Sequence, residues 1–225
     1  QQNVKVFEIA KAFLPRSLPL NELPIEKGVL SVAAYGNGSD FFVFKGIIEL
    51  LMREMGIDDR VSYAPYTHPS FHPGRTTIIQ FSGQSLGIFG EIHPVVGSNY
   101  EMNGLRIMMA ELDLDTILNE AQTYRKYVAL PKYPAVKRDI AITADKKLSA
   151  ESILRLIREL AGDLLTEIEL FDIYEGTQIP DGYRSLAYSL SYRAADRTLR
   201  DDEISKIHLK VTEGLEKMPG AKLRQ

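Results

Sequence analysis

The sequence predicts an α+β protein in two parts, on three observations. Alternating apolar and polar residues in the first half predict an antiparallel sheet with strands near 4–12, 27–35, 76–81, 85–89 and 106–112. From Tyr133 onward the pattern becomes strand, helix, strand, strand, helix and short strand, the order of a ferredoxin-like βαββαβ domain. Pro131 and Pro134 mark an extended connection between the two parts, because proline disfavours helix before it and donates no ladder hydrogen bond. We therefore expect one domain over residues 1–125 and a second over residues 126–225.

Two helices are predicted in the first half. Ser39 or Asp40 supplies an N-cap for the first, whose apolar residues then recur at three- and four-residue spacing. Gly56 ends it as a left-handed C-terminal residue. A shorter helix is expected over residues 114–121.

The second half predicts a complete split βαβ unit. Its expected elements are a strand at 138–143, a helix from Ser149 to Gly162, a strand at 164–174, a strand at 185–193, a helix capped by Thr198 and Asp201, and a closing strand at 221–225. The apolar phase of the strand at 164–174 shifts at Leu170-Phe171, which predicts a bulge.

The strand at 185–193 has the clearest alternation in the chain. Leu186, Tyr188, Leu190 and Tyr192 face one way, and small residues followed by Arg193 face the other. The apolar set must meet the helices, so the tyrosines are expected in the core rather than stacked on RNA bases. A split βαβ sheet has helices on one face only. The other face suits either ordinary solvation or a phosphate backbone, and the residues alone do not separate the two.

Composition is that of an ordinary globular protein of 225 residues without cysteine, which suits a reducing cytosol. The net charge of −3 divides into −4 for residues 1–125 and +1 for residues 126–225. Neither part has a strongly basic nucleic-acid footprint, so RNA contact would depend on local clusters of cations. No apolar run is long enough to span a membrane. Because the chain begins at Gln1 and enters a strand at once, we interpret it as part of a longer polypeptide.

Three groups in the first half are candidate sites. His68 and His72 have the i, i+4 spacing of a metal pair, but a proline follows each, which favours turns. Arg75 is expected to anchor a loop or an interface rather than to bind a ligand. The alternating carboxylates at 111, 113 and 115 suit a cation or, more simply, a strand that leads into a helix N-terminus.

Several phrases resemble the β subunit of bacterial-type phenylalanyl-tRNA synthetases, in family order across nearly the whole chain. They are Asp40–Gly46, Phe71–Thr76, Gly87–Pro94, Ala110–Asp115, Tyr133–Ile142 and Asp196–Ile204. The resemblance implies a class II synthetase-like domain that has lost its active site, followed by a ferredoxin-fold anticodon-binding domain. Consistent with lost chemistry, the glycine-rich stretch from Gly83 runs through Glu91 into Ile92 and His93, without the Glu-Arg that class II enzymes use near ATP, and no G-x-x-x-x-G-K phosphate loop is present.

The resemblance further implies a cytoplasmic α2β2 phenylalanine–tRNA ligase in which the α subunit performs catalysis with ATP and Mg²⁺. This chain would contribute no catalytic residue, metal ligand or cofactor site, and its partners would be tRNA(Phe) and the α subunit. We expect a folded RNA to dock on the open face of the second sheet, with candidate contacts at Lys137, Arg138, Arg184, Arg193, Arg197 and Lys206. The expected subunit-interface or structural residues of the first domain are Arg75, His72, Glu91 and His93.

Two other functions stay open at this point. One is a free-standing RNA-binding protein that uses the ferredoxin-like module, and the other is a regulatory protein that senses an amino acid, since a fold does not fix a function.

Overall fold

The computed structural model describes residues 3–122, 124, 127 and 129–224. The chain forms two compact units, Gln1–Lys126 and Tyr127–Gln225, each with its own hydrophobic core. Both units combine antiparallel sheets with helices, which confirms the predicted α+β class.

The first unit is built around a six-stranded sheet with the order β1-β2-β6-β5-β4-β3. All five neighbouring pairs are antiparallel. Its elements are β1 (Val4–Leu14), β2 (Ile25–Tyr35), α1 (Phe41–Glu54), a 3₁₀ turn (Asp58–Arg60), β3 (Val61–Pro65), β4 (Phe71–Phe81), β5 (Gln84–Ile92), α2 (Pro94–Asn99), β6 (Ile107–Asp113) and α3 (Leu114–Glu120).

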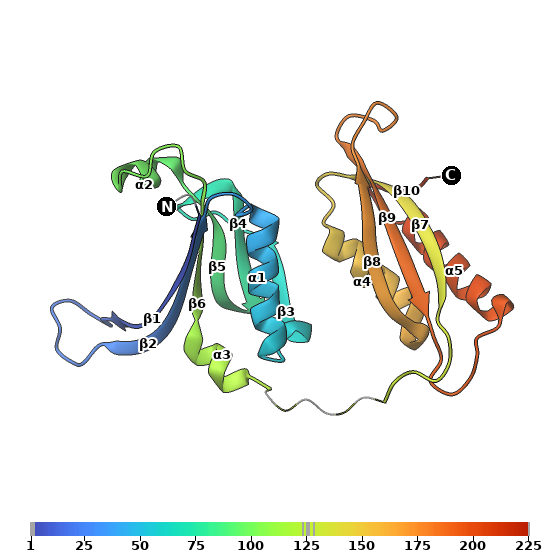
Figure 1. Ribbon diagram of the computed structural model, residues 1–225, viewed down its shortest axis with the longest axis horizontal. Helices are drawn as coiled ribbons and strands as arrows, with labels where there is room; N and C mark the ends of the chain where they lie inside the picture. The colour runs from blue at the N-terminus through green and yellow to red at the C-terminus, as the bar shows by residue number, and fades with distance from the viewer. Residues whose placement is uncertain (1–2, 123, 125–126, 128, 225) are drawn as a thin grey trace. The chain divides into compact units, whose positions relative to one another are not determined.

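Helix α1 lies along one face of this sheet (Figure 1) and supplies part of its core. Its buried stripe is Phe44, Ile48 and Met52. The Asp40 carboxylate accepts a hydrogen bond from the Val43 amide at 2.8 Å, so the predicted N-cap is confirmed. Gly56 follows the helix with φ of 69°, as a left-handed C-terminal residue requires.

Two short elements were missed by sequence reasoning. Strand β3 has only five residues and ends in a proline, so its apolar–polar alternation is too short to predict a strand from the sequence. Helix α2 has six residues, too few for a helical period to be recognised.

The second unit has a four-stranded antiparallel sheet with the order β10-β7-β9-β8, which confirms the predicted βαββαβ topology. Its elements are β7 (Val136–Asp145), α4 (Ala150–Ala161), a 3₁₀ turn (Gly162–Leu164), β8 (Leu165–Tyr174), β9 (Tyr183–Tyr192), α5 (Asp201–Glu216) and β10 (Ala221–Leu223). Helices α4 and α5 lie on the same side of the sheet (Figure 1).

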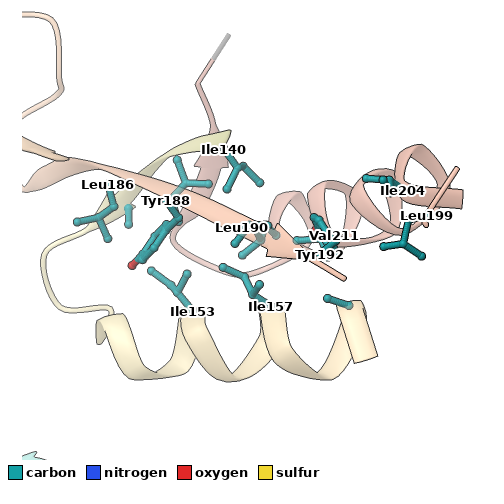
Figure 2. Packing of buried hydrophobic residues seen from close by; sticks show 14 of the residues in the cluster. Ile140, Ile153, Ile157, Leu186, Tyr188, Leu190, Tyr192, Leu199, Ile204 and Val211 are labelled. Carbon is teal, nitrogen blue, oxygen red and sulfur yellow. The ribbon is translucent and has the colours of Figure 1, made fainter. Parts of the chain in front are cut away.

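The core of the second unit lies between the sheet and these two helices. Figure 2 shows Leu186, Tyr188 and Leu190 of β9 opposite Ile153 and Ile157 of α4. Tyr188 and Tyr192 have no exposed surface, so they pack in the core as predicted. Burial raises the pKa of Tyr192 to about 12.

Local signals in this unit were predicted with one error. Ser149 caps α4 through a hydrogen bond from the Ser152 amide at 3.2 Å, and the register of β8 shifts between Leu170 and Asp172, at the expected bulge. The predicted Thr198–Asp201 cap is wrong. Arg200 is instead the N-cap, and the Glu203 carboxylate accepts a hydrogen bond from the Arg200 amide at 3.0 Å.

Candidate nucleic-acid interface

The face of the second sheet that points away from α4 and α5 has a floor of small polar side chains. Ser185, Ser189 and Ser191 of the central strand β9 alternate with the tyrosines and leucines of the core. The serines are 4–9% exposed because β7 and β8 flank them on both sides. The described helices α4 and α5 lie on the other side of the sheet and leave this face uncovered.

Charged side chains border this floor in an uneven pattern. Strand register places Lys137 and Glu167 beside Ser191, and Asp139 and Glu169 beside Ser189. All four are exposed. The face therefore carries carboxylates along β8 and within β7, and its positive charge is confined to its ends.

Only two of the six predicted RNA contacts lie on this face. Lys137 points there by strand alternation, and Arg193 continues the outward set of β9. Their positions are consistent with the expected role, which stays a prediction.

Arg138 and Arg184 alternate to the helix side instead. Arg138 forms an ion pair with Asp201 at the start of α5, with an N–O distance of 3.0 Å. Arg184 donates a hydrogen bond to the Leu148 carbonyl at 3.2 Å, in the loop before α4. The expectation that these arginines lie on the open face therefore needs correction, because both occupy the opposite phase of their strands.

The last two predicted contacts lie outside the sheet. Lys206 is exposed on α5, so it too is on the helix side. Arg197, in the loop between β9 and α5, donates two hydrogen bonds to Glu203 at 2.8 and 2.9 Å. The backbone hydrogen bond from Arg200 and the side-chain hydrogen bond from Arg197 lower the pKa of Glu203. Arg197 is thus held in one orientation by a carboxylate, with part of its charge already neutralised.

A cavity of ≈ 640 Å³ lies at the end of the sheet where Arg193 emerges. Its cationic lining residues are Lys132, Arg193 and Arg197, and Asp163 and Asp196 also line it. The Nε atom of Arg193 is buried and has no hydrogen-bond partner among the residues that the structure describes. This end is therefore a concave part of the second unit's surface that carries three cations against two carboxylates, which suits a phosphate group.

Sequence reasoning missed two cations on the same face, Lys222 and Arg224. Strand β10 places Lys222 opposite Thr143, and the amide of Arg224 donates to the Ala141 carbonyl at 2.8 Å. The Arg224 guanidinium lies 5.6 Å from the Tyr174 ring centroid. The predicted strand at 221–225 carried the signal, since its alternation sets both cations on the side away from Leu223.

The three histidines of the first unit share one local structure. In each His-Pro-X segment the imidazole Nδ1 accepts a hydrogen bond from the amide two residues on, at 3.1–3.2 Å for His68, His72 and His93. The intervening proline has no N–H, so the donor in each segment is the amide of the residue after it. His68 precedes a turn, as predicted, whereas His72 lies in β4 and His93 caps α2. Within residues 3–122, 124, 127 and 129–224 no group of three or more His, Asp or Glu side chains could hold a metal ion.

Arg75 belongs to a charged cluster centred on Glu91 of β5. The Glu91 carboxylate, 7% exposed, accepts from Arg75 at 2.8 Å and from Arg106 at 3.2 Å. Burial alone would raise the pKa of Glu91, but hydrogen bonds from the two arginines outweigh it and lower the pKa. The cluster ties β4 and β5 to the residue before β6, which is a structural role. A role at a subunit interface stays a prediction for Arg75, Glu91, His72 and His93.

Replacing Glu91 with glutamine should weaken the first unit in a pH-dependent way. The native carboxylate has a pKa below its ordinary value, so its contribution is full above about pH 4.5 and is lost as the pH falls through the lowered value. We expect Glu91→Gln to cost about 1–3 kcal/mol at pH 7, typical of hydrogen bonds to a charged group. Urea unfolding of both proteins between pH 3 and 7 measures the difference, which should shrink on acidification. A constant difference would contradict this account.

The acidic residues at the end of β6 are mostly engaged. Asp113 caps α3 by accepting from the Thr116 amide at 3.1 Å, and Asp115 accepts from the Gly28 amide at 2.7 Å. This confirms the strand-to-helix interpretation over a cation site. Within the described part of the chain, no helix is both long and apolar enough to cross a membrane.

Together, the fold and this face define an α+β protein whose last module is a ferredoxin-fold sheet with one side free for a partner. Comparison with known families agrees with that class. Residues 131–224 match the ferredoxin-fold anticodon binding domain. Residues 1–114 match the phenylalanyl tRNA synthetase beta chain CLM domain.

The chain belongs to the phenylalanyl-tRNA synthetase β-chain family. It is 41% identical over 98% of its length to the phenylalanine–tRNA ligase beta subunit of Clostridium acetobutylicum, and covers 27% of that protein. It is 40% identical over 98% of its length to the same subunit of Clostridium tetani, covering 27%, and 38% identical over 99% to that of Symbiobacterium thermophilum, covering 26%. The chain thus spans about a quarter of these relatives' length.

Proposed function

We propose that this chain is the non-catalytic C-terminal part of a phenylalanine–tRNA ligase β subunit and that its second unit binds the anticodon stem of tRNA(Phe). The single observation that carries the proposal is the order of the two family matches along one chain, with the anticodon-binding match on the module whose sheet has a free face. The family resemblance favours this function over a free-standing regulatory protein.

The geometry supports recognition of phosphates rather than bases. Tyr188 and Tyr192 of β9 are buried in the core, and the centre of the open face presents serines instead of aromatic rings. Phosphate contacts fix the position of a nucleic acid, whereas base contacts read its sequence. An RNA stem would enter at the end bearing Lys137 and Arg193 and would be kept from β8 by Glu167 and Glu169. The second unit would therefore position the tRNA and leave amino-acid selection to the ligase active site.

The first unit would pack against the catalytic α subunit. Its β1–β2 hairpin leaves large apolar side chains exposed, with Phe7 at 73%, Leu18 at 79% and Leu23 at 90% exposure. Contiguous exposed apolar surface of this kind is typical of a protein interface. The ATP and Mg²⁺ of the α2β2 cytoplasmic ligase would be bound by the α subunit, because this chain lacks both the glycine-rich Glu-Arg segment and a phosphate loop.

Binding of an anticodon stem-loop tests the proposal. Fluorescence anisotropy with a labelled tRNA(Phe) stem-loop should show weak binding by the 225-residue chain. The affinity should fall steeply as the salt concentration rises, because binding releases counterions from the RNA phosphates. A single strand of the same composition is the control and should bind less well. The absence of binding at low salt, or equal binding of the unpaired strand, would contradict the proposal.

A further inference from the structure

The first unit contains an apolar cavity on the sheet face opposite α1. Met108 and Ala110 of β6 are buried in the core under α1, and the alternating residues Ile107 and Met109 line the cavity. Its volume is ≈ 540 Å³, which lies within the range of small-molecule sites. None of the functions derived so far uses this space.

The cavity is lined by side chains from the sheet and from the segment around α2. Its floor includes Val6 of β1, Ala33 of β2 and Met109 of β6. Val96 of α2 and the following residues Tyr100 and Met102 also line it, and Tyr100 keeps 76% of its surface exposed. Figure 1 shows α2 at one end of the sheet and α1 along the sheet's other side. The space is thus an open crevice lined by the sheet face and by the segment that contains α2.

One unsatisfied charge lies at this cavity. Glu111 is exposed and follows Met109 by two residues on the same face of β6, so its carboxylate is at the mouth. The neighbouring carboxylates are engaged, since Asp113 pairs with Lys27 at 3.0 Å and Asp115 accepts from Gly28. The Glu111 carboxylate has no hydrogen bond or ion pair with any residue that the structure describes. An apolar crevice with a free carboxylate at its mouth is complementary to an apolar molecule that carries one cation.

We propose that this cavity binds a small amphipathic amine, with its aromatic or aliphatic body in the crevice and its ammonium group beside Glu111. One carboxylate with no other acidic side chain lining the space suits a monovalent organic cation rather than a metal ion, which needs several oxygen ligands. A ligand with a carboxylate in the same place would face like-charge repulsion. The site requires neither RNA nor another subunit, so it stands or falls independently of the function proposed above.

Three probes distinguish the contribution of the ligand's apolar body to binding from that of its charge. 4-Phenylbutylamine has both features, 4-phenylbutyrate has the same body with the opposite charge, and butylamine has the charge with little body. Amide chemical shifts of the full 225-residue chain, followed by NMR at pH 7, should give saturable binding of the first probe with shifts in β6 and α2. We expect its affinity to exceed that of each other probe by about tenfold or more.

Variants assign the two parts of the site. Glu111→Gln keeps the shape and should remove the preference for 4-phenylbutylamine over 4-phenylbutyrate. Ala33→Phe fills the floor and should abolish binding of both, with its folding checked from the amide spectrum. Glu169→Gln, on the second unit, is the matched control and should change nothing. Retention of the preference in Glu111→Gln, or shifts that map to the second unit, would overturn the proposal.

Discussion

Replacing Phe89 with alanine should lower the free energy of unfolding of the first unit by about 3–5 kcal/mol, the usual cost of truncating a buried phenylalanine. Phe89 has no exposed surface and lies at the centre of the core between β5 and α1. Its ring is 5.4 Å from that of Phe41, 6.4 Å from Phe44 and 6.2 Å from Tyr63, measured between centroids. Alanine would leave a cavity that three rigid rings cannot close.

Urea unfolding monitored separately through amide signals of β5 and β9 measures this effect. The two units have separate cores, so the transition of the second unit should stay where it is. Phe7→Ala is the matched control, because Phe7 is 73% exposed and a surface truncation should change stability by no more than about 0.5 kcal/mol. Equal losses in Phe89→Ala and Phe7→Ala would show that the α1 face is not the core of this unit.

Replacing Lys137 and Arg193 together with glutamine should remove most of the affinity of the second unit for an RNA stem. Both side chains lie at the same end of the open face, and Arg193 also lines the cavity there. If each contacts one phosphate, the slope of log affinity against log salt should become shallower by about 1.8. The same loss of charge should weaken binding by roughly tenfold or more at low salt.

Two matched variants make this result specific. Arg138→Gln with Lys206→Gln removes the same charge from the helix side and should leave binding within about twofold, apart from a uniform long-range effect. Glu167→Gln with Glu169→Gln removes carboxylates from the rim of the face and should tighten binding. Weakening by the helix-side pair with no change from the open-face pair would place the RNA on α4 and α5 instead.

Much of the fold could be predicted because its signals are local. The alternation from Leu186 to Tyr192 predicted both strand β9 and its buried side. The cap at Ser149 marked the start of α4, and the phase change at Leu170 marked the bulge in β8. Elements shorter than one period, such as β3 and α2, lacked that signal. The error at the start of α5 arose because several polar residues in succession could act as the N-cap. Only the folded loop shows that Arg200 takes this place, with Glu203 as its partner.

The site was harder to predict, because the face that a cation occupies depends on strand register and on its ion-pair partners. Arg138 and Arg184 are as basic as Arg193 in the sequence, but their strand phase directs them to the helix side. The carboxylates of β8 showed no distinctive pattern until pairing with β9 brought them beside the serine floor.

Chemical-shift mapping of an anticodon stem-loop on the second unit tests the central claim most directly. An RNA docked on the uncovered side of the sheet should shift the amides around Lys137, Ser191 and Arg193 and leave the exposed residues of α4 and α5 unchanged. Shifts confined to those helices, with none along the serine floor, would contradict the account.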